Sequence, residues 1–353
     1  IFIAEEGLEH LLFGILADLP DSNLPMGSAG RSHVEKARAA VEALNHTYGG
    51  GFFLLFRPPV FQPRDERYMG WERKRGALVE LVRLLKGRRS GLQVAAGDRS
   101  ALADVRFVIT LDSDTNLNVG AARELIGAML HPLNRPKVDA RRKIVTSGYG
   151  LLQPRVGVEL GCANKSQFSR IFAGQGGVDP YGGACSDVYH DLFDQGTFTG
   201  KGIFDVNAFF LCLNGRLPQN TVLSHDLLEG SYLHAGLIGD VELTDGYPYK
   251  VTSYFSRLHR WVRGDWQLLP WLGRTVTNET GERVPNPIPP MAKWKIFDNL
   301  RRSLSPICTL LALLLGMCFS GAAFGAAAAA AILSAASNLL LSGADLAFRR
   351  GAG

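Results

Sequence analysis

Apolar runs alternate with helical patterns along the first 150 residues of the chain. Continuous apolar runs predict buried strands at residues 11–17, 52–56, 106–111 and 144–148. Apolar positions spaced by three or four residues predict helices at residues 33–45, capped by Ser32, at 69–85 and at 121–130. This alternation predicts an α/β fold with a mainly parallel sheet and helices on both of its faces.

Acidic residues follow two of these predicted strands. Asp18 comes after the first strand, and Asp112 and Asp114 come after the third. Because ligands bind such sheets beyond the carboxyl ends of the strands, we expect these acids at a ligand site. Residues 150–281 are rich in glycine and aromatic residues without a clear period, and we expect them to form loops around that site.

The pattern changes in the tail, where residues 303–341 contain no charged residue. As a single helix these 39 residues would be ~58 Å long, against roughly 30 Å for the core of a bilayer. We therefore expect two transmembrane helices that turn near residues 320–325. Basic residues before and after the pair predict a hairpin with both ends in the cytoplasm. A buried helical hairpin of a soluble protein is the alternative.

Charge and cysteine usage narrow the range of partners. The net charge of +5 favours anionic partners such as nucleotide phosphates or anionic lipid. We do not expect nucleic acid, since zinc-finger spacing and a helix-turn-helix signature are both missing. The five cysteines are scattered without a Cys-x-x-Cys pair, which suits a reducing compartment. The chain starts without Met, and we expect it to be part of a longer polypeptide.

Two acidic motifs are candidates for chemistry. Asp112 and Asp114 could together hold Mg²⁺ or Mn²⁺ and a nucleotide sugar, with a solvated turn as the alternative. Asp226 could act as a general base toward a sugar hydroxyl. Asp226 and Glu229 also fit a capping box, and we expect His225 to be structural rather than a ligand.

Basic and aromatic residues mark two further segments. Lys74 lies in a cationic cluster at a predicted helix start, where a docked phosphate would offset the unfavourable helix dipole. An exposed basic face is the alternative. Residues 257–267 hold three arginines and two tryptophans, which suit diphosphate and sugar rings. Single-stranded nucleic acid or a membrane interface would also suit this composition.

In order, these pieces resemble the processive inverting enzymes of glycosyltransferase family 2. A closer resemblance is to the glycosyltransferase domain of the cyclic β-1,2-glucan synthases, family 84, and it extends from about residue 11 to about residue 315. Six motifs carry it: Trp-Glu-Arg-Lys-Arg-Gly at 71–76, Thr-Leu-Asp-Ser-Asp-Thr at 110–115, His-Pro-Leu-Asn-Arg-Pro at 131–136, Thr-Gly-Lys-Gly-Ile at 199–203, Leu-Ser-His-Asp-Leu-Leu-Glu-Gly at 223–230 and His-Arg-Trp-Val-Arg-Gly-Asp-Trp-Gln at 259–267.

The resemblance implies a GT-A-type, Rossmann-like catalytic domain over residues 1–290 that lacks its first strand. An interfacial segment and two transmembrane helices would follow over residues 291–353. The enzyme would be a metal-dependent, inverting hexosyltransferase that uses Mg²⁺ or Mn²⁺ and moves glucose from UDP-glucose to a growing β-1,2-glucan. We expect it in the bacterial inner membrane, in contact with lipid, with the catalytic domain in the cytosol and further domains on the same polypeptide.

The resemblance also assigns roles to residues. Asp18 would contact uracil, Lys74 and Arg260 the diphosphate, Asp112 and Asp114 the metal and donor, Trp261 the acceptor sugar, and Asp226 would be the base. Arg257 departs from the wider superfamily, which has glutamine there.

Two other functions stay open. One is a membrane family 2 transferase with another sugar or linkage, which the motifs alone do not distinguish. The other is a non-catalytic sugar-nucleotide-binding membrane module. The presence of every expected acid argues against the module, since a protein without activity would be free to lose them.

Overall fold

The computed structural model describes residues 11–63, 65–173, 187–222 and 224–350. It divides into two compact units, Ile1–Ile296 and Phe297–Gly353, which are described separately below.

A three-stranded sheet forms the N-terminal part of the first unit. Its order is β1 (Phe13–Asp18), β2 (Phe52–Arg57), β5 (Gln93–Ala96), with β1 and β2 parallel and β5 antiparallel to β2. Helix α1 (Ser28–Tyr48) connects the two parallel strands, which confirms the predicted strand-helix-strand unit. The predicted cap is wrong: Gly27 precedes the first turn, and Ser32 lies inside the helix.

The larger sheet has five strands. Their order is β6 (Phe107–Thr110), β11 (Gly202–Asp205), β10 (Leu151–Val158), β12 (Ala235–Asp245) and β7 (Thr115–Leu117). Only β10 and β12 pair in parallel, and the other three ladders are antiparallel. The prediction of a mainly parallel sheet is therefore wrong. The physical reason is that three of the five strands come from the glycine-rich region 150–281, which was expected to form loops.

The fourth predicted strand lies outside this sheet. Strand β9 (Ile144–Ser147) pairs with β8 (Lys137–Asp139) in a separate two-stranded sheet. The start of the predicted 69–85 helix is also different, because β4 (Arg67–Met69) pairs with β3 (Val60–Gln62) and helix α2 (Arg73–Leu85) begins only afterwards. These short hairpins surround the two main sheets.

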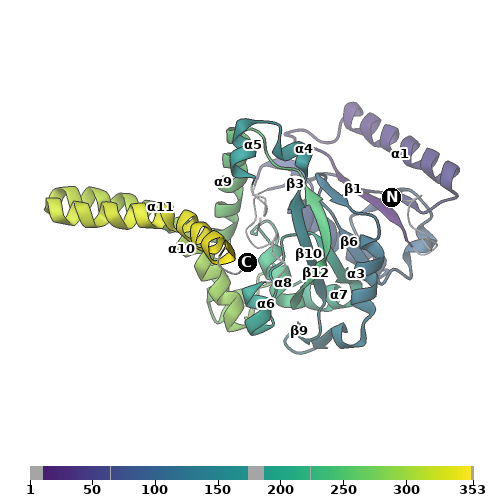
Figure 1. Cartoon of the computed structure of the whole chain (residues 1–353). Helices are drawn as coiled ribbons and strands as arrows, with labels where there is room; N and C mark the ends of the chain where they lie inside the picture. The colour runs from purple at the N-terminus through teal and green to yellow at the C-terminus, as the bar shows by residue number, and fades with distance from the viewer. Residues whose placement is uncertain (1–10, 64, 174–186, 223, 351–353) are drawn as a thin grey trace. The chain divides into compact units, whose positions relative to one another are not determined.

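Helices pack against the large sheet, and apolar side chains between helix and strands form a hydrophobic core. Helix α3 (Ala121–Leu130) packs against β10, β11 and β12 (Figure 1). Its Leu125 and Met129 are almost fully buried there. Ten of the thirteen residues of α2 are buried, and α2 packs against α7. The remaining elements of this unit are α4 (Leu160–Ala163), α5 (Gln167–Phe172), α6 (Val188–Phe193), α7 (Val206–Leu213), α8 (Asp226–Leu233), α9 (Val251–Gln267), β13 (Thr275–Thr277) and β14 (Arg283–Pro285).

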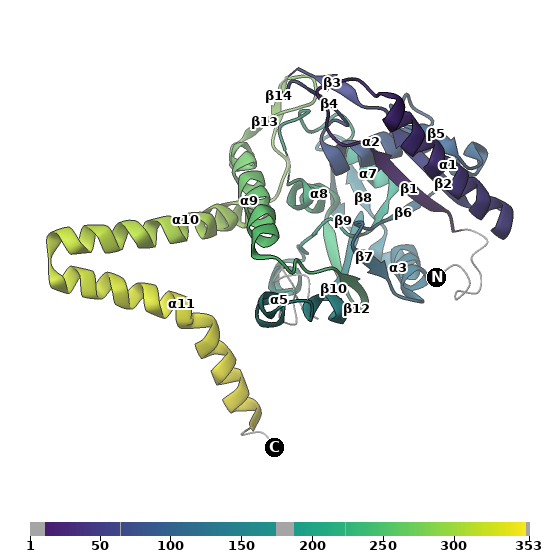
Figure 2. The same cartoon turned by 90° about the horizontal axis from the view of Figure 1, so that it is seen from above.

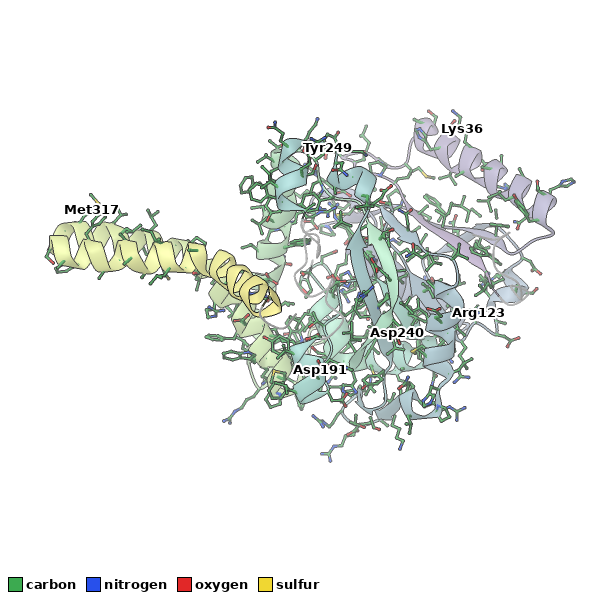
Figure 3. The ribbon with its side chains drawn as sticks, in the orientation of Figure 1. Lys36, Arg123, Asp191, Asp240, Tyr249 and Met317 are labelled. Atoms are coloured by element: carbon green, nitrogen blue, oxygen red, sulfur yellow. The ribbon has the colours of Figure 1, made fainter. Side chains whose placement is uncertain are left out.

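The second unit consists of helices. Helix α10 (Pro290–Phe319) runs into it from the first unit, and α11 (Gly321–Arg350) follows after a break at Ser320, inside the predicted turn (Figure 2). Exposed apolar side chains such as Met317 project from α10 (Figure 3), which is long and apolar enough to cross a membrane. The described apolar part of α11, Gly321–Ser334, is shorter than a crossing. The second crossing remains a prediction.

Candidate active site

Two opposite charges from distant segments meet beyond the end of β6. Lys74, in the first turn of α2, donates a hydrogen bond from Nζ to Oδ1 of Asp112, which follows β6 by two residues. The same ammonium donates to the carbonyl oxygen of Gly200 at 2.7 Å. The segments around residues 74, 112 and 200 therefore converge on one ammonium group.

A second lysine extends this contact into a chain of alternating charges. Nζ of Lys201 lies 3.4 Å from Oδ2 of Asp112 and also forms an ion pair with Asp245, at the end of β12. Thr115 lies opposite Asp245 in the β7–β12 ladder, and its Oγ1 donates to Oδ1 of Asp245 at 2.6 Å. Each carboxylate thus has two partners. Asp112 lies between the ammonium groups of Lys74 and Lys201, and Asp245 lies between Lys201 and the hydroxyl of Thr115.

These contacts favour the charged forms of Asp112 and Lys201. Burial opposes ionisation of Asp112, but Lys74 and Lys201 outweigh it and lower the pKa of Asp112 below its ordinary value. Burial likewise opposes the charged form of Lys201, but Asp245 and Asp112 outweigh it and raise the pKa of Lys201. At neutral pH Asp112 and Lys201 are therefore both charged.

Asp114 is held at the start of β7 and faces α9. Its backbone oxygen accepts a hydrogen bond from the amide of Gly246 at 3.0 Å, and a Cβ on Gly246 would lie 3.3 Å from Cβ of Asp114. Its carboxylate accepts a hydrogen bond from Nη2 of Arg257 at 3.2 Å. Arg257 is thus a contact between α9 and the acid pair.

Asp226 lies against the loop that holds Gly200. Gly200 has a φ of +89°, and a Cβ on it would lie 2.9 Å from Oδ1 of Asp226. Any larger residue would therefore meet both backbone strain and the carboxylate. Asp226 is the first residue of α8, and the side chain of His225 before it makes no capping hydrogen bond. The predicted capping box is wrong, because the Glu229 side chain is directed to His225 instead.

His225 and Glu229 form a buried ion pair behind Asp226. Nδ1 of His225 lies 3.0 Å from Oε1 of Glu229 and 3.4 Å from Oδ1 of Asp226. Burial disfavours the charged imidazole, but Glu229 and Asp226 outweigh it and raise the pKa of His225. This supports the expectation that His225 is structural.

The same three residues have the spacing of a metal site. One ligand atom from each lies within 4.8 Å of the other two. Arg75, whose pKa burial lowers to about 10, is buried beside this group and interacts electrostatically with Glu229. Because a buried guanidinium would repel a cation, we interpret the cluster as an ion-pair network.

The environment of Asp226 raises the pKa of its carboxyl group. Burial raises its pKa; the charge of His225 opposes the shift, while that of Glu229 adds to it. A third of the side-chain surface stays accessible, so we expect the shift to be smaller than full burial would give. A carboxylate with a raised pKa is a stronger base than an ordinary aspartate.

Asp18, at the end of β1, forms an ion pair with Arg57. Nε of the buried Arg57 donates to Oδ1 of Asp18 at 2.8 Å, and Nη2 donates to Oδ2. Arg57 also donates to the carbonyl oxygens of Trp71 and Arg73, in the segment that leads to Lys74. An open pocket of about 440 Å³ lies here, lined by Asp18, Leu19, Pro20, Asp21, Gly70 and Arg73.

Helix α9 packs closely against the segment before Asp226. A Cβ on Gly264 would lie 2.3 Å from Cβ of Ser224. Arg260 and Trp261 lie on the exposed surface of this helix. Within the described part of the chain, no hydrogen bond or ion pair joins Arg260 to the acids.

The structure thus brings together four of the predicted site residues. Lys74, Asp112 and Asp226 meet around Gly200, and Asp114 follows Asp112 by two residues and contacts Arg257 of α9. Sequence reasoning missed Lys201, Asp245 and Arg57. The Thr-Gly-Lys-Gly motif already contained Lys201, and an acid after the alternating pattern of residues 241–244 was the available signal for Asp245.

Comparison with known proteins identifies a relative. No protein-family model matches the chain. Over 312 residues, 87% of the chain, it is 42% identical to the cyclic β-(1,2)-glucan synthase NdvB of Rhizobium meliloti (strain 1021). The matched region is 11% of that protein, so the chain spans about a tenth of its relative's length. The resemblance seen in the motifs is thereby confirmed, and the chain is a domain related to the cyclic β-1,2-glucan synthases.

Proposed function

We propose that this domain transfers glucose from UDP-glucose to a growing β-1,2-glucan, with inversion at the anomeric carbon. The observation that carries the proposal is the convergence of Lys74, Asp112 and Asp226 around Gly200, in a chain 42% identical to a cyclic β-(1,2)-glucan synthase. A cation, an acid pair and a separate carboxylate of raised pKa are the groups that sugar transfer from a diphosphate needs.

Asp226 acts as the base. The acceptor hydroxyl oxygen attacks the anomeric carbon, its proton moves to the Asp226 carboxylate, and the bond to the diphosphate oxygen breaks so that UDP leaves. The raised pKa of Asp226 favours this proton uptake. The close packing of Gly200 fixes the carboxylate relative to Lys74, which contacts the same glycine.

The acid pair suits a divalent cation. Asp112 and Asp114 offer hard oxygen ligands, the side chains are 36% and 42% exposed, and the lowered pKa of Asp112 keeps it ionised. Lys74, Lys201 and Arg257 contact these carboxylates, and a divalent cation would have to replace part of those contacts. Because the pair is accessible, unlike the buried cluster at His225, Mg²⁺ or Mn²⁺ could do so and would then neutralise charge on the diphosphate leaving group. Lys74 places a further positive charge beside Asp112, where the diphosphate would lie.

The remaining predicted site residues would bind other parts of the donor and the acceptor. Asp18 and the open pocket beside Arg73 would receive uracil, Arg260 the diphosphate, and Trp261 the acceptor sugar. Support comes from the accessibility of the pocket and from the exposure of Arg260 and Trp261 on α9. Helix α10 anchors the domain in the bacterial inner membrane, with the site in the cytosol and further domains on the same polypeptide.

The test is incorporation of radiolabelled glucose from UDP-glucose by membranes that contain the full-length protein, with and without Mg²⁺ or Mn²⁺. Linkage analysis of the polymer follows, and membranes with Asp226→Asn serve as the control. Metal-dependent β-1,2-glucan that the control lacks is the expected result. Incorporation from a different sugar nucleotide, or a different linkage, would identify another membrane transferase. No incorporation from any donor would leave a binding module.

A further inference from the structure

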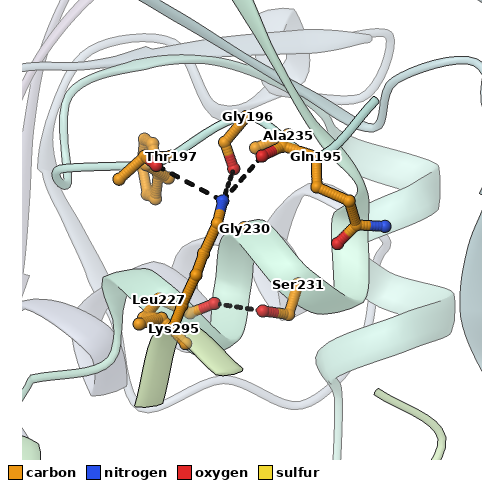
Figure 4. A pocket seen from close by; sticks show the side chains of 9 residues that line it. Gln195, Gly196, Thr197, Leu227, Gly230, Ser231, Ala235 and Lys295 are labelled. Carbon is orange, nitrogen blue, oxygen red and sulfur yellow. Dashed lines mark hydrogen bonds between the residues drawn. The ribbon is translucent and has the colours of Figure 1, made fainter. Parts of the chain in front are cut away.

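Lys295, in the first turns of α10, is buried among backbone oxygens. Its side chain is 8% exposed, and Nζ donates hydrogen bonds to the carbonyls of Gln195 at 2.6 Å and Gly196 at 3.0 Å. The hydroxyl of Thr197 accepts the third at 3.3 Å (Figure 4). An ammonium group has three N–H donors, so this set satisfies all of them. All four residues belong to the first compact unit.

These acceptors begin the loop that ends at the candidate active site. The amide of Gly196 donates to the carbonyl of Ala235 at 2.8 Å, which holds the loop to the start of β12. The amide of Thr197 donates to Asp187, and that of Thr199 donates to the buried Gln153. The next residue, Gly200, contacts Lys74 and Asp226. Only two residues therefore separate Thr197, the last acceptor of Lys295, from Gly200 at the site.

Helix α8, which begins at Asp226, closes the other side of Lys295. A small cavity of about 10 Å³ lies between them, lined by Leu227 and Gly230 of α8 (Figure 4) and by Phe198 of the loop. This is roughly the space that a cavity needs to hold one water molecule. A shift of the Lys295 side chain would consequently disturb both the loop and α8.

We propose that Lys295 is a positioning residue that fixes the Gly200 loop against Asp226 from the foot of α10. The proposal rests on the proposed function, in which Asp226 is the base. A buried ammonium is costly without partners, and an apolar side chain would fill the space with less desolvation. The lysine instead links three successive loop residues to one helix, which gives the loop a single position.

The test compares Lys295→Met with Lys293→Met in the full-length protein. Lys293 is a matched control: it lies two residues away on α10 and its Nζ also donates to backbone carbonyls, those of Leu272 and Gly273. Those residues are remote in sequence from the Gly200 loop. We expect Lys295→Met to lower kcat per folded protein at least tenfold, and Lys293→Met to change it less than twofold.

Hydrogen exchange provides the readout that is independent of sugar transfer. Amides 196–201 should exchange at least tenfold faster in Lys295→Met and at the wild-type rate in Lys293→Met. If Lys295→Met does not fold, Thr197→Val, which removes one acceptor, should show a smaller change in the same direction. Unchanged exchange and kcat in the variant that folds would overturn the proposal. If the wild type itself makes no glucan but the loop of Lys295→Met exchanges faster, the positioning role is supported and the proposed function is wrong.

Discussion

Arg257 on α9 donates a hydrogen bond to Oδ2 of Asp114, 3.2 Å away. The pair is partly accessible, so its contribution is modest, about 0–1 kcal/mol. It nevertheless places a fixed positive charge on one of the two proposed metal ligands. Arg257 would therefore compete with the proposed divalent cation for Asp114.

Replacing this arginine should strengthen metal binding. In Arg257→Gln, the Mn²⁺ concentration for half-maximal glucose transfer should fall by up to about fivefold, which corresponds to about 1 kcal/mol. A titration of activity against Mn²⁺ measures it. Arg263→Gln, an exposed change on the same helix, is the control. A higher Mn²⁺ requirement in Arg257→Gln would instead mean that the arginine binds donor.

Asp226→Asn should abolish transfer and leave UDP binding intact, because an amide cannot accept the hydroxyl proton. In the wild type, kcat should fall as the pH drops through the raised pKa of Asp226, above the ordinary value of about 3.9. A pH–rate profile and UDP binding by calorimetry are the measurements. Equal loss of binding and turnover would argue against the assignment as base.

The same variant should not be less stable at neutral pH. A carboxyl group whose pKa is raised on folding binds its proton more tightly in the folded protein, so its stabilising contribution is present at low pH and lost as the pH rises through that raised pKa. Asparagine removes the penalty of the buried charge. We expect the melting temperature of Asp226→Asn at pH 7 to equal or exceed the wild-type value, by up to about 4 °C. A clear decrease would show that the carboxylate has a structural role.

Lys201→Met should weaken the fold and impair transfer, because Asp112 and Asp245 lose a shared partner. We expect a loss of about 1–3 kcal/mol in the free energy of unfolding at pH 7. The stabilisation that follows from the lowered pKa of Asp112 is present above about pH 4 and lost as the pH falls further, so the deficit should shrink there. Denaturant unfolding at pH 7 and below pH 4 measures this. Lys86→Met, at an exposed 3.4 Å contact with Asn207, should change stability little.

Gly264→Ala should separate α9 from the segment before Asp226. The added methyl would lie 2.3 Å from Cβ of Ser224, so the helix has to move, at a cost of about 1–3 kcal/mol. Transfer should fall with it. Gly127→Ala is the matched control in α3, where a Cβ meets nothing within 4 Å. That change should stabilise the protein by about 0.5–1 kcal/mol. Equal melting temperatures for the two variants would contradict the close packing.

Local pattern predicted the first sheet better than the second. Strands β1 and β2 are continuous apolar runs with one helix between them, and their parallel pairing follows from that order. Strand β12 contains glycines, and its buried positions do not alternate regularly with exposed ones, so its period is weak. Its neighbours β10 and β7 lie about 80 and 120 residues earlier in the chain, and no local period encodes such pairing.

The candidate site shows the same division. Asp112 could be named because a carboxylate after an apolar strand is a local feature, and Asp226 because its motif is specific. Asp245 depends on the β7–β12 register, which brings it opposite Thr115, and Lys201 depends on where the Gly200 loop is held. Such contacts arise only when distant segments pack.

The ion pair between Asp18 and Arg57 has a consequence for how the first sheet assembles. The two residues lie directly opposite each other at the ends of β1 and β2. A slip by one residue would place Ala17 or Leu19 beside Arg57 and leave a buried guanidinium without its counter-ion. Because an unpaired buried charge is destabilised by several kcal/mol, misregistered pairings would be rejected. The pair thus favours the correct register of the two strands during folding, and its Asp18 also lines the pocket proposed above for the nucleotide.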